Sequence, residues 1–231
     1  MMVLYYIRHG QPIYELNKLT ELGQKQADAV GERLALLGID KIFSSPSNRA
    51  IETAMPLSRV TGKEIEILDF ADEDDVARDF MVDDGTGVVR WASDVEKIRT
   101  AFAMPDIKTR YDWYQDPIFS DYNFGEGIRR IDKATDSFLE RLGYRHNRKC
   151  GYFEPISPTE EKIALFAHAG FGQVFMSSVL DIPYPQIANQ FVIGNTGVSR
   201  IHFEVQFGIC VPRVHMFSSD AHIYKKNLPD I

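Results

Sequence analysis

The residues of this chain best suited to chemistry stand directly after its first apolar run. Residues 3–7, VLYYI, have the composition of a buried β-strand, and Arg8, His9 and Gly10 follow them. Pro12 ends the strand shortly beyond. In an open α/β sheet, ligands collect in the crevice at the carboxyl ends of the strands. We therefore expect Arg8 and His9 to face such a crevice.

A second histidine has the same context much later in the sequence. Residues 162–167, KIALFA, form another apolar run, and His168, Ala169 and Gly170 follow it before a helical pattern begins at residue 171. The backbone amides of Ala169 and Gly170 then lie near a helix start, where anions bind. The sequence predicts that His168 lies close to His9.

A second arginine lies in the first turn of a predicted helix. The strand expected over residues 40–44 ends in Ser44-Ser45-Pro46, and Ser47 or Asn48 can cap the helix that follows. Arg49 at that position opposes the helix dipole if it is simply an exposed charge. It is favourable when an anion lies beside it, because the helix start and the guanidinium attract the same ligand.

Two guanidinium groups and two imidazoles on one edge form a pocket suited to a phosphate dianion. Arginine holds two phosphoryl oxygens at once and neutralises the charge that develops in the transition state. A histidine attacks phosphorus only through an unprotonated ring nitrogen. Arg8 and Arg49 favour this form of His9, because nearby cations disfavour the imidazolium.

Four motifs in a fixed order resemble the histidine phosphatase superfamily, the group that contains cofactor-dependent phosphoglycerate mutases, broad-specificity phosphatases and phosphohistidine phosphatases. The resemblance covers both ends of the chain and is poor over residues 69–122. It implies a phosphohistidine intermediate on His9, a backbone carbonyl that fixes the ring of His9, and stabilisation of the transferring phosphoryl group by His168. The motifs are RHG at 8–10, LTELGQKQA at 19–27, SSPSNRAIETA at 44–54 and FAHAGFGQV at 166–174.

The mechanism also needs a carboxyl group that protonates the leaving oxygen and later activates water. In relatives this group follows the helix with the second arginine, which points to the acidic cluster at residues 69–75. We choose Glu73 for its reach and spacing, with Asp72 and Asp74 as alternatives. Crowding of carboxylates is expected to raise the pKa of one member. A solvated acidic loop is the structural alternative, and the family's usual sequence pattern around this glutamate is missing.

The predicted elements define an α/β fold, a three-layer α/β/α sandwich with a mostly parallel central sheet. A chain of 231 residues with 44% hydrophobic content suits a single domain over residues 1–231, with a helical or irregular lid insertion at about 69–122. Residues 144–159 are expected to form a loop or irregular hairpin, and the tail from Lys225 to be loosely held. Further helices are expected at 20–37, 93–103, 125–142 and 171–180, and further strands at 63–68, 198–203 and 211–217.

The insertion is rich in aromatic residues, which favours a small satellite core over a ligand cage. An insertion at this point of the chain is where relatives build the lid over their substrate. The aromatic residues are Phe80, Trp91, Phe102, Tyr111, Trp113, Tyr114, Phe119 and Tyr122.

Composition excludes several other classes. A net charge of −7 argues against nucleic acid as the main partner. Cys150 and Cys210 are too few for a disulfide framework and are expected to be reduced, partly buried thiols. No stretch has the ~20 apolar residues of a membrane span, and no signal peptide is found, so a soluble cytoplasmic protein is expected. Histidine-rich spacing such as HExxH is absent, and two arginines make a metal unnecessary, so no metal or cofactor is expected. The remaining histidines, expected to be surface or strand residues, are His146, His202, His215 and His222.

The leading hypothesis is a metal-independent phosphomonoesterase that acts on a small phosphorylated substrate through phosphorylated His9. Phosphoglycerate mutase-type phosphoryl transfer is the alternative within enzymes, and the short segment 11–18 with Gln11 favours the hydrolase. A catalytically inactive module that binds phosphate is the alternative from another class. The substrate and the oligomeric state do not follow from the sequence.

Overall fold

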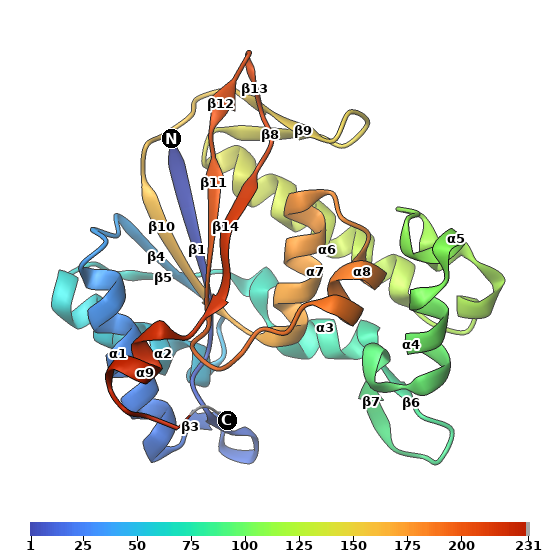
Figure 1. The fold of residues 1–231 in the computed structure, drawn as a ribbon, viewed down its shortest axis with the longest axis horizontal. Helices are drawn as coiled ribbons and strands as arrows, with labels where there is room; N and C mark the ends of the chain where they lie inside the picture. The colour runs from blue at the N-terminus through green and yellow to red at the C-terminus, as the bar shows by residue number, and fades with distance from the viewer. Residues whose placement is uncertain (230–231) are drawn as a thin grey trace.

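The structure, a computed structural model, describes residues 1–229 and is built around a six-stranded sheet (Figure 1). The strand order is β14-β11-β1-β10-β4-β5. The four strands β1, β10, β4 and β5 run parallel to one another. Strand β11 is antiparallel to β1, and β14 is antiparallel to β11 and so runs in the direction of β1. The predicted mostly parallel sheet is confirmed. The strands are β1 (Met2–Arg8), β4 (Lys41–Ser44), β5 (Ile65–Ile67), β10 (Lys162–Ala167), β11 (Val198–Phe203) and β14 (Arg213–Ser219).

One face of the sheet is covered by three helices, α1 (Glu21–Ala35), α2 (Asn48–Thr61) and α9 (Ala221–Lys225) (Figure 1). Successive side chains of a strand point to opposite faces. Tyr5 and Ile7 of β1 therefore share a buried cluster with the apolar side chains of α1 and α2. Thr20 caps α1 as predicted, because its side chain accepts from the Gly23 amide.

The opposite face packs on a larger core beneath four further helices. Leu4 and Tyr6 point to this side and share the core with Phe138, Phe171 and Phe175. The sheet thus lies between two helical layers, which confirms the predicted α/β/α sandwich (Figure 1). The helices are α3 (Glu73–Phe80), α6 (Phe124–Arg141), α7 (Ala169–Leu180) and α8 (Tyr184–Gln190).

Residues 69–122 add short elements beyond α3 and α7 (Figure 1). The ring of Trp113 lies 5.1 Å from Phe102 and 5.8 Å from Tyr184 of α8, centroid to centroid. These aromatic residues therefore extend the main core and do not form a separate satellite core. Besides α3, the segment contains η2 (Asp69–Ala71), β6 (Met81–Asp83), β7 (Val89–Trp91), η3 (Ala92–Asp94), α4 (Glu96–Ala103), α5 (Pro105–Lys108), η4 (Trp113–Gln115) and η5 (Pro117–Phe119).

The remaining strands are short. A four-stranded sheet of order β12-β13-β9-β8 contains the hairpin expected at 144–159, and β2 pairs with β3 around a 3-10 turn. These elements are β2 (Pro12–Ile13), η1 (Tyr14–Leu16), β3 (Lys18–Leu19), β8 (Tyr144–Asn147), β9 (Tyr152–Pro155), β12 (Val205–Gln206) and β13 (Ile209–Cys210).

A short helix precedes the tail that was expected to be loosely held from Lys225. Helix α9 buries His222 and Ile223, and Lys225 is its last residue; residues 230 and 231 lie outside the described part of the chain. Both cysteines are free, and Cys150 is exposed whereas Cys210 is buried. Within residues 1–229, no helix has the length and apolar character that crossing a bilayer requires.

Candidate active site

The ends of two adjacent parallel strands bring the two predicted histidines together. Arg8, the last residue of β1, is in register with Ala167, the last residue of β10. The His9 amide donates to the Ala167 carbonyl at 2.9 Å, so His9 and His168 follow the same sheet edge. Both side chains are buried, and their ring centroids lie 5.2 Å apart.

Helix α2 brings Arg49 to the same edge, because β4 lies beside β10 and ends just before the helix. Arg49 is 7% exposed, so its guanidinium group is not simply an exposed charge on the surface. Its Nη1 donates to Asn17 Oδ1 at 2.8 Å, and the Ser47 hydroxyl donates to the same oxygen at 2.7 Å. Ser47 occupies the N-cap position, but its side chain holds Asn17 and does not cap the helix as expected.

Close backbone packing fixes the Arg-His-Gly turn. The Gly10 amide donates to Thr53 Oγ1 at 3.0 Å, and that hydroxyl donates to the Arg49 carbonyl at 2.7 Å. A Cβ on Gly10 would lie 2.7 Å from the Gly23 carbonyl oxygen of α1, so larger residues do not fit. The motif at 19–27 therefore supports the site by packing against its backbone.

His9 has a defined tautomer and is neutral. Its Nδ1 lies 2.7 Å from the Gly10 carbonyl oxygen. Because a carbonyl can only accept, Nδ1 carries the proton and Nε2 keeps its lone pair. Burial lowers the pKa of His9 to about 3, with Arg8 and Arg49 lowering it further against the Gly10 hydrogen bond. An unprotonated Nε2 is the form that a nucleophile requires.

His168 differs from His9, because its hydrogen-bonded ring nitrogen is Nε2. Its Nε2 lies 2.7 Å from Ser45 Oγ, which also accepts from the Ser47 amide at 3.2 Å. Burial holds the pKa of His168 well below its usual range, and the neighbouring His9, Arg49 and Arg8 act in the same direction. When the Ser45 hydroxyl donates to Nε2 of this neutral ring, the proton of His168 is on Nδ1.

Three polar atoms around the two rings are buried and lack a hydrogen-bond partner among residues 1–229. They are Arg8 Nε, Arg49 Nε and His168 Nδ1. Arg8 is otherwise held by its Nη1, which donates to the Ile193 carbonyl at 2.8 Å. Buried donors are nearly always paired in proteins. A tetrahedral oxyanion offers acceptors to all three donors and matches the two positive charges.

Glu73 lies at the start of α3 and reaches the start of α7. Its Oε1 accepts from the Gly170 amide at 3.0 Å, and its Oε2 accepts from the Phe171 amide at 2.7 Å. The Gly170 amide therefore binds Glu73, which differs from its expected contact with phosphate; Ala169 is the first residue of α7.

The pKa of Glu73 is raised, chiefly because the carboxyl group is buried. The two amides, Arg49 and Arg8 oppose this shift, so crowding among acidic residues is not its cause, contrary to the expectation. The neighbouring alternatives have other surroundings: Asp72 Oδ1 accepts from the Asp74 amide and caps α3, and Asp74 is exposed. Of the three acidic residues, Glu73 contacts the helix that begins after His168.

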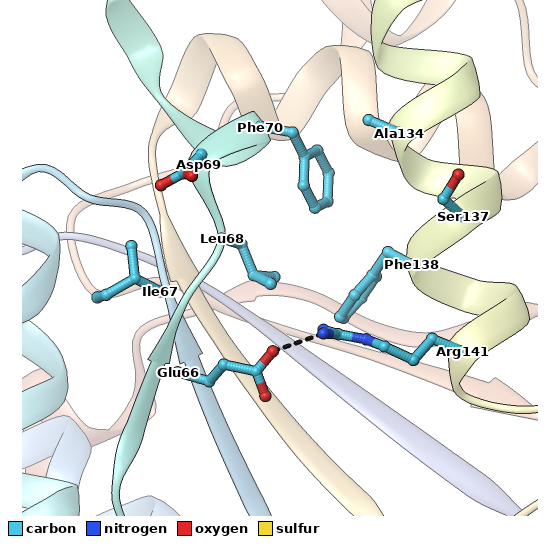
Figure 2. Close-up of a pocket in the computed structure, with 9 residues that line it drawn as sticks. All are labelled: Glu66, Ile67, Leu68, Asp69, Phe70, Ala134, Ser137, Phe138 and Arg141. Atoms are coloured by element: carbon cyan, nitrogen blue, oxygen red, sulfur yellow. Dashed lines mark hydrogen bonds and ion pairs between the residues drawn. The ribbon is translucent and has the colours of Figure 1, made fainter.

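The insertion reaches the site through Trp91, whose ring leaves no room for a Cβ on Gly170. Beside this contact is a cavity of about 230 Å³ lined by Arg8, Trp91, Asp94 and Arg99, among others. A larger groove of about 390 Å³ lies between residues 66–70 and α6 (Figure 2). None of the predicted site residues lines that groove, whereas Arg8, Ala169 and Gly170 line the cavity beside Trp91.

Sequence reasoning missed three residues at the site. Asn17 holds Arg49, Ser45 bonds His168, and the exposed Tyr14 lies edge-on to His9 at 6.3 Å, with the Arg49 guanidinium 5.6 Å from its ring centroid. Ser45 directly follows a predicted strand, and this position could have indicated that it belongs to the site. Asn17 and Tyr14 lie in an irregular loop whose path the sequence does not define.

Two neutral imidazoles and two guanidinium groups thus gather at the parallel strand ends of an α/β/α sandwich, in part within a segment that matches a known family. Residues 4–78 match the family model of the histidine phosphatase superfamily (branch 1). This match confirms, over this N-terminal region, the resemblance predicted from the motifs. The matched segment contains Arg8, His9, Arg49 and Glu73.

Known proteins similar to this chain include several phosphatases. A candidate phosphoserine phosphatase of Hydrogenobacter thermophilus is 24% identical over 88% of this chain and 91% of its own length. A phosphoserine phosphatase mutant from Entamoeba histolytica, solved with phosphoserine, has a TM-score of 0.62 at 21% identity, over 96% of this chain and all of that one. A mycobacterial glucosyl-3-phosphoglycerate phosphatase, solved with VO3, has a TM-score of 0.61 at 18% identity, over 94% and 99% of the two chains. The two solved structures show that the fold is shared.

Proposed function

We propose that this protein is a metal-independent phosphomonoesterase that acts through a phosphohistidine intermediate on His9. The observation that supports it most is a set of buried atoms around a neutral His9 that have no hydrogen-bond partner in the described part of the chain: Arg8 Nε, Arg49 Nε and His168 Nδ1. These donors suit the oxygens of a phosphoryl group, and the free Nε2 of His9 suits attack on its phosphorus.

In the first step, His9 Nε2 forms a bond to phosphorus as the bond to the leaving oxygen breaks. Glu73 donates its proton to that oxygen, and its raised pKa favours the protonated form. Arg8 and Arg49 hold the equatorial oxygens, and His168 Nδ1 donates to one of them.

In the second step, water attacks phosphorus and the bond to His9 breaks. Glu73, now ionised, takes the proton of the water and returns to its starting form. Inorganic phosphate leaves, and His9 is again neutral. The same carboxyl group therefore acts first as an acid and then as a base.

The substrates proposed are small phosphorylated alcohols with charged groups. The cavity of about 230 Å³ beside Arg8 has room for a few non-hydrogen atoms, and Arg99 and Asp94 offer it charges of both signs. The similar proteins are named for phosphoserine and for glucosyl-3-phosphoglycerate, both of this kind. Residues 69–122 are proposed to act as the lid over the site in a single domain, since Trp91 packs on Gly170.

Hydrolysis of p-nitrophenyl phosphate tests this function. We expect turnover that a chelator does not change and that His9→Ala abolishes. Tight vanadate binding without turnover would instead indicate the inactive module, against which the position of Glu73 argues. Phosphoryl transfer between positions of phosphoglycerate that exceeds hydrolysis would indicate the mutase.

A further inference from the structure

Thr196 has an unfavourable backbone conformation next to the proposed nucleophile. Its φ is +52°, in the left-handed region that a β-branched residue rarely adopts. Its amide donates to the carbonyls of both Arg8 and His9, at 3.1 Å and 3.2 Å. Such strain persists where the surroundings fix the residue, and it concentrates at functional sites. Thr196 therefore fixes the position of the backbone at Arg8 and His9.

The side chain of Thr196 is held from the C-terminal helix. Its Oγ1 lies 2.9 Å from His222 Nε2 and donates to the Asn195 carbonyl at 2.8 Å. Thr196 is fully buried, and His222 is 4% exposed. The sequence predicted a surface or strand residue at His222, and the structure shows that prediction to be wrong.

Arg33 of α1 fixes the tautomer of His222. Arg33 Nη1 lies 3.1 Å from His222 Nδ1 and donates to the Ser219 carbonyl at 3.0 Å. Because a guanidinium can only donate, Nδ1 of His222 accepts and its Nε2 carries the proton given to Thr196. Burial and the charge of Arg33 lower the pKa of His222 to about 4, while Asp220 opposes the shift. His222 is therefore neutral while it connects Arg33 to Thr196.

We propose that Arg33, His222 and Thr196 form a positioning relay that holds His9 in line for attack on phosphorus. The relay runs from α1 through α9 to the turn before β11, and from there to the carbonyls of Arg8 and His9. His222 touches neither substrate nor phosphorus, so it is a positioning residue. The proposal rests on the proposed function of His9. Without the relay, the strained turn relaxes and the nucleophile loses its alignment.

Replacing His222 tests the relay. We expect His222→Leu to lower kcat about 10- to 100-fold, since a displacement of about 1 Å at a reacting group costs this much. His222→Gln keeps a donor and an acceptor and is expected to recover part of the loss. Lys225→Ala, an exposed change on the same helix, is the matched control and should leave kcat unchanged. Thermal unfolding of each variant shows whether the protein is folded at the assay temperature.

A double-mutant cycle with Thr196→Val identifies the pathway. If His222 acts through Thr196, the losses of kcat in the two single variants are not additive in the double variant. Additive losses, or a kcat of folded His222→Leu equal to wild type, would overturn the relay while leaving the phosphatase intact.

A measurement on the resting protein separates the relay from the proposed function. Nitrogen-15 NMR of the His9 ring reports its tautomer and its order without any turnover. We expect one sharp Nδ1-protonated form in wild type and Lys225→Ala, and a tautomer mixture or broadened signal in His222→Leu. An unchanged His9 signal in His222→Leu would contradict the relay even if the wild type hydrolyses no phosphate ester. Absence of turnover with a changed signal would contradict the proposed function alone.

Discussion

Buried histidine side chains in two regions of this protein have pKa values shifted in opposite directions. At the strand ends, His9 and His168 lie near Arg8 and Arg49, and their pKa values are lowered. On the hairpin of β8 and β9, the fully buried side chain of His146 lies between two carboxylates, 3.0 Å from Asp136 and 2.9 Å from Asp181.

Burial lowers the pKa in all three cases, and the partners decide the outcome. At His146 the hydrogen bonds to the two aspartates outweigh burial, so its pKa is raised. At the strand ends the neighbours are cations, which add to the effect of burial. The comparison teaches that burial keeps the imidazoles of the candidate site neutral, and that the arginines proposed to bind the substrate reinforce this effect. The neutral ring of His9 is the form proposed to attack phosphorus, whereas His146, with its raised pKa, links β8 to Asp136 of α6 and to Asp181 after α7.

The largest effect is expected for His9→Ala, which removes the only nitrogen proposed to bond phosphorus. We predict a loss of kcat of about 10⁴-fold or more, because the covalent intermediate cannot form without the nucleophile. Steady-state hydrolysis of p-nitrophenyl phosphate measures it, and vanadate binding shows whether the pocket is intact. A residual rate within tenfold of wild type would place the nucleophile elsewhere.

Glu73→Gln is expected to have the next largest effect. It removes the proposed proton donor while keeping an oxygen for the amide of Gly170 or Phe171, and general acid catalysis is worth about 10²–10⁴-fold. The pH dependence of kcat/KM tests the role of Glu73 more specifically. Because Glu73 acts first as an acid, kcat/KM should fall as pH rises through its raised pKa, and this limb should vanish in the variant. At low pH, kcat/KM should fall toward pH 3, where His9 becomes protonated.

These pH limbs are measured after correction for the ionisation of the substrate. Asp74→Asn, an exposed change on the same helix, is the control. If Asp74→Asn removes the limb and Glu73→Gln does not, the carboxyl group has been assigned to the wrong residue.

A smaller effect is predicted for Ser45→Ala. The change removes the hydroxyl that bonds His168 Nε2 and with it the preference for a proton on Nδ1. One hydrogen bond of this kind is worth about 1 kcal/mol, or about fivefold in kcat. The matched control is Ser58→Ala, whose hydroxyl donates to the Lys63 carbonyl far along α2. Equal kcat in both variants and wild type would show that Ser45 does not set the tautomer.

His146→Gln should have the smallest effect on turnover but should lower stability. Losing an imidazolium from between two carboxylates is expected to cost about 2 kcal/mol of unfolding free energy. The folded pKa of His146 is raised, so its contribution is complete below the unfolded pKa and is lost as pH rises through the folded value. Denaturant unfolding at pH 6 and pH 9 should therefore show a larger difference from wild type at pH 6. A larger loss of unfolding free energy at pH 9 than at pH 6 would contradict a raised pKa of His146, and with it the contrast to His9 and His168.

The parts of the fold that followed from the sequence are those set by local pattern. The strand at residues 2–8, the capped helix after Thr20 and the helix that begins near Arg49 each have a clear apolar period and an end signal. Because parallel strands end at one edge, the pairing of His9 with His168 also followed from two local patterns.

What the sequence did not predict depends on contacts between distant segments. Ser47 has the sequence of a helix cap, yet its hydroxyl is used by Asn17 from another loop. His222 sits in a five-residue helix with too few residues for a period, and its burial depends on α1. The aromatic residues of the insertion join the main core because α8, much later in the chain, packs against them.

Trapping the phosphorylated protein tests the central claim most directly. The wild type is mixed with p-nitrophenyl phosphate, quenched in alkali within the first turnover, digested and analysed by mass spectrometry. We predict one phosphoryl group, stable in alkali and lost in acid, on the peptide that contains His9, and none in His9→Ala. A phosphoryl group on any other residue, or rapid hydrolysis with no labelled peptide, would contradict the account.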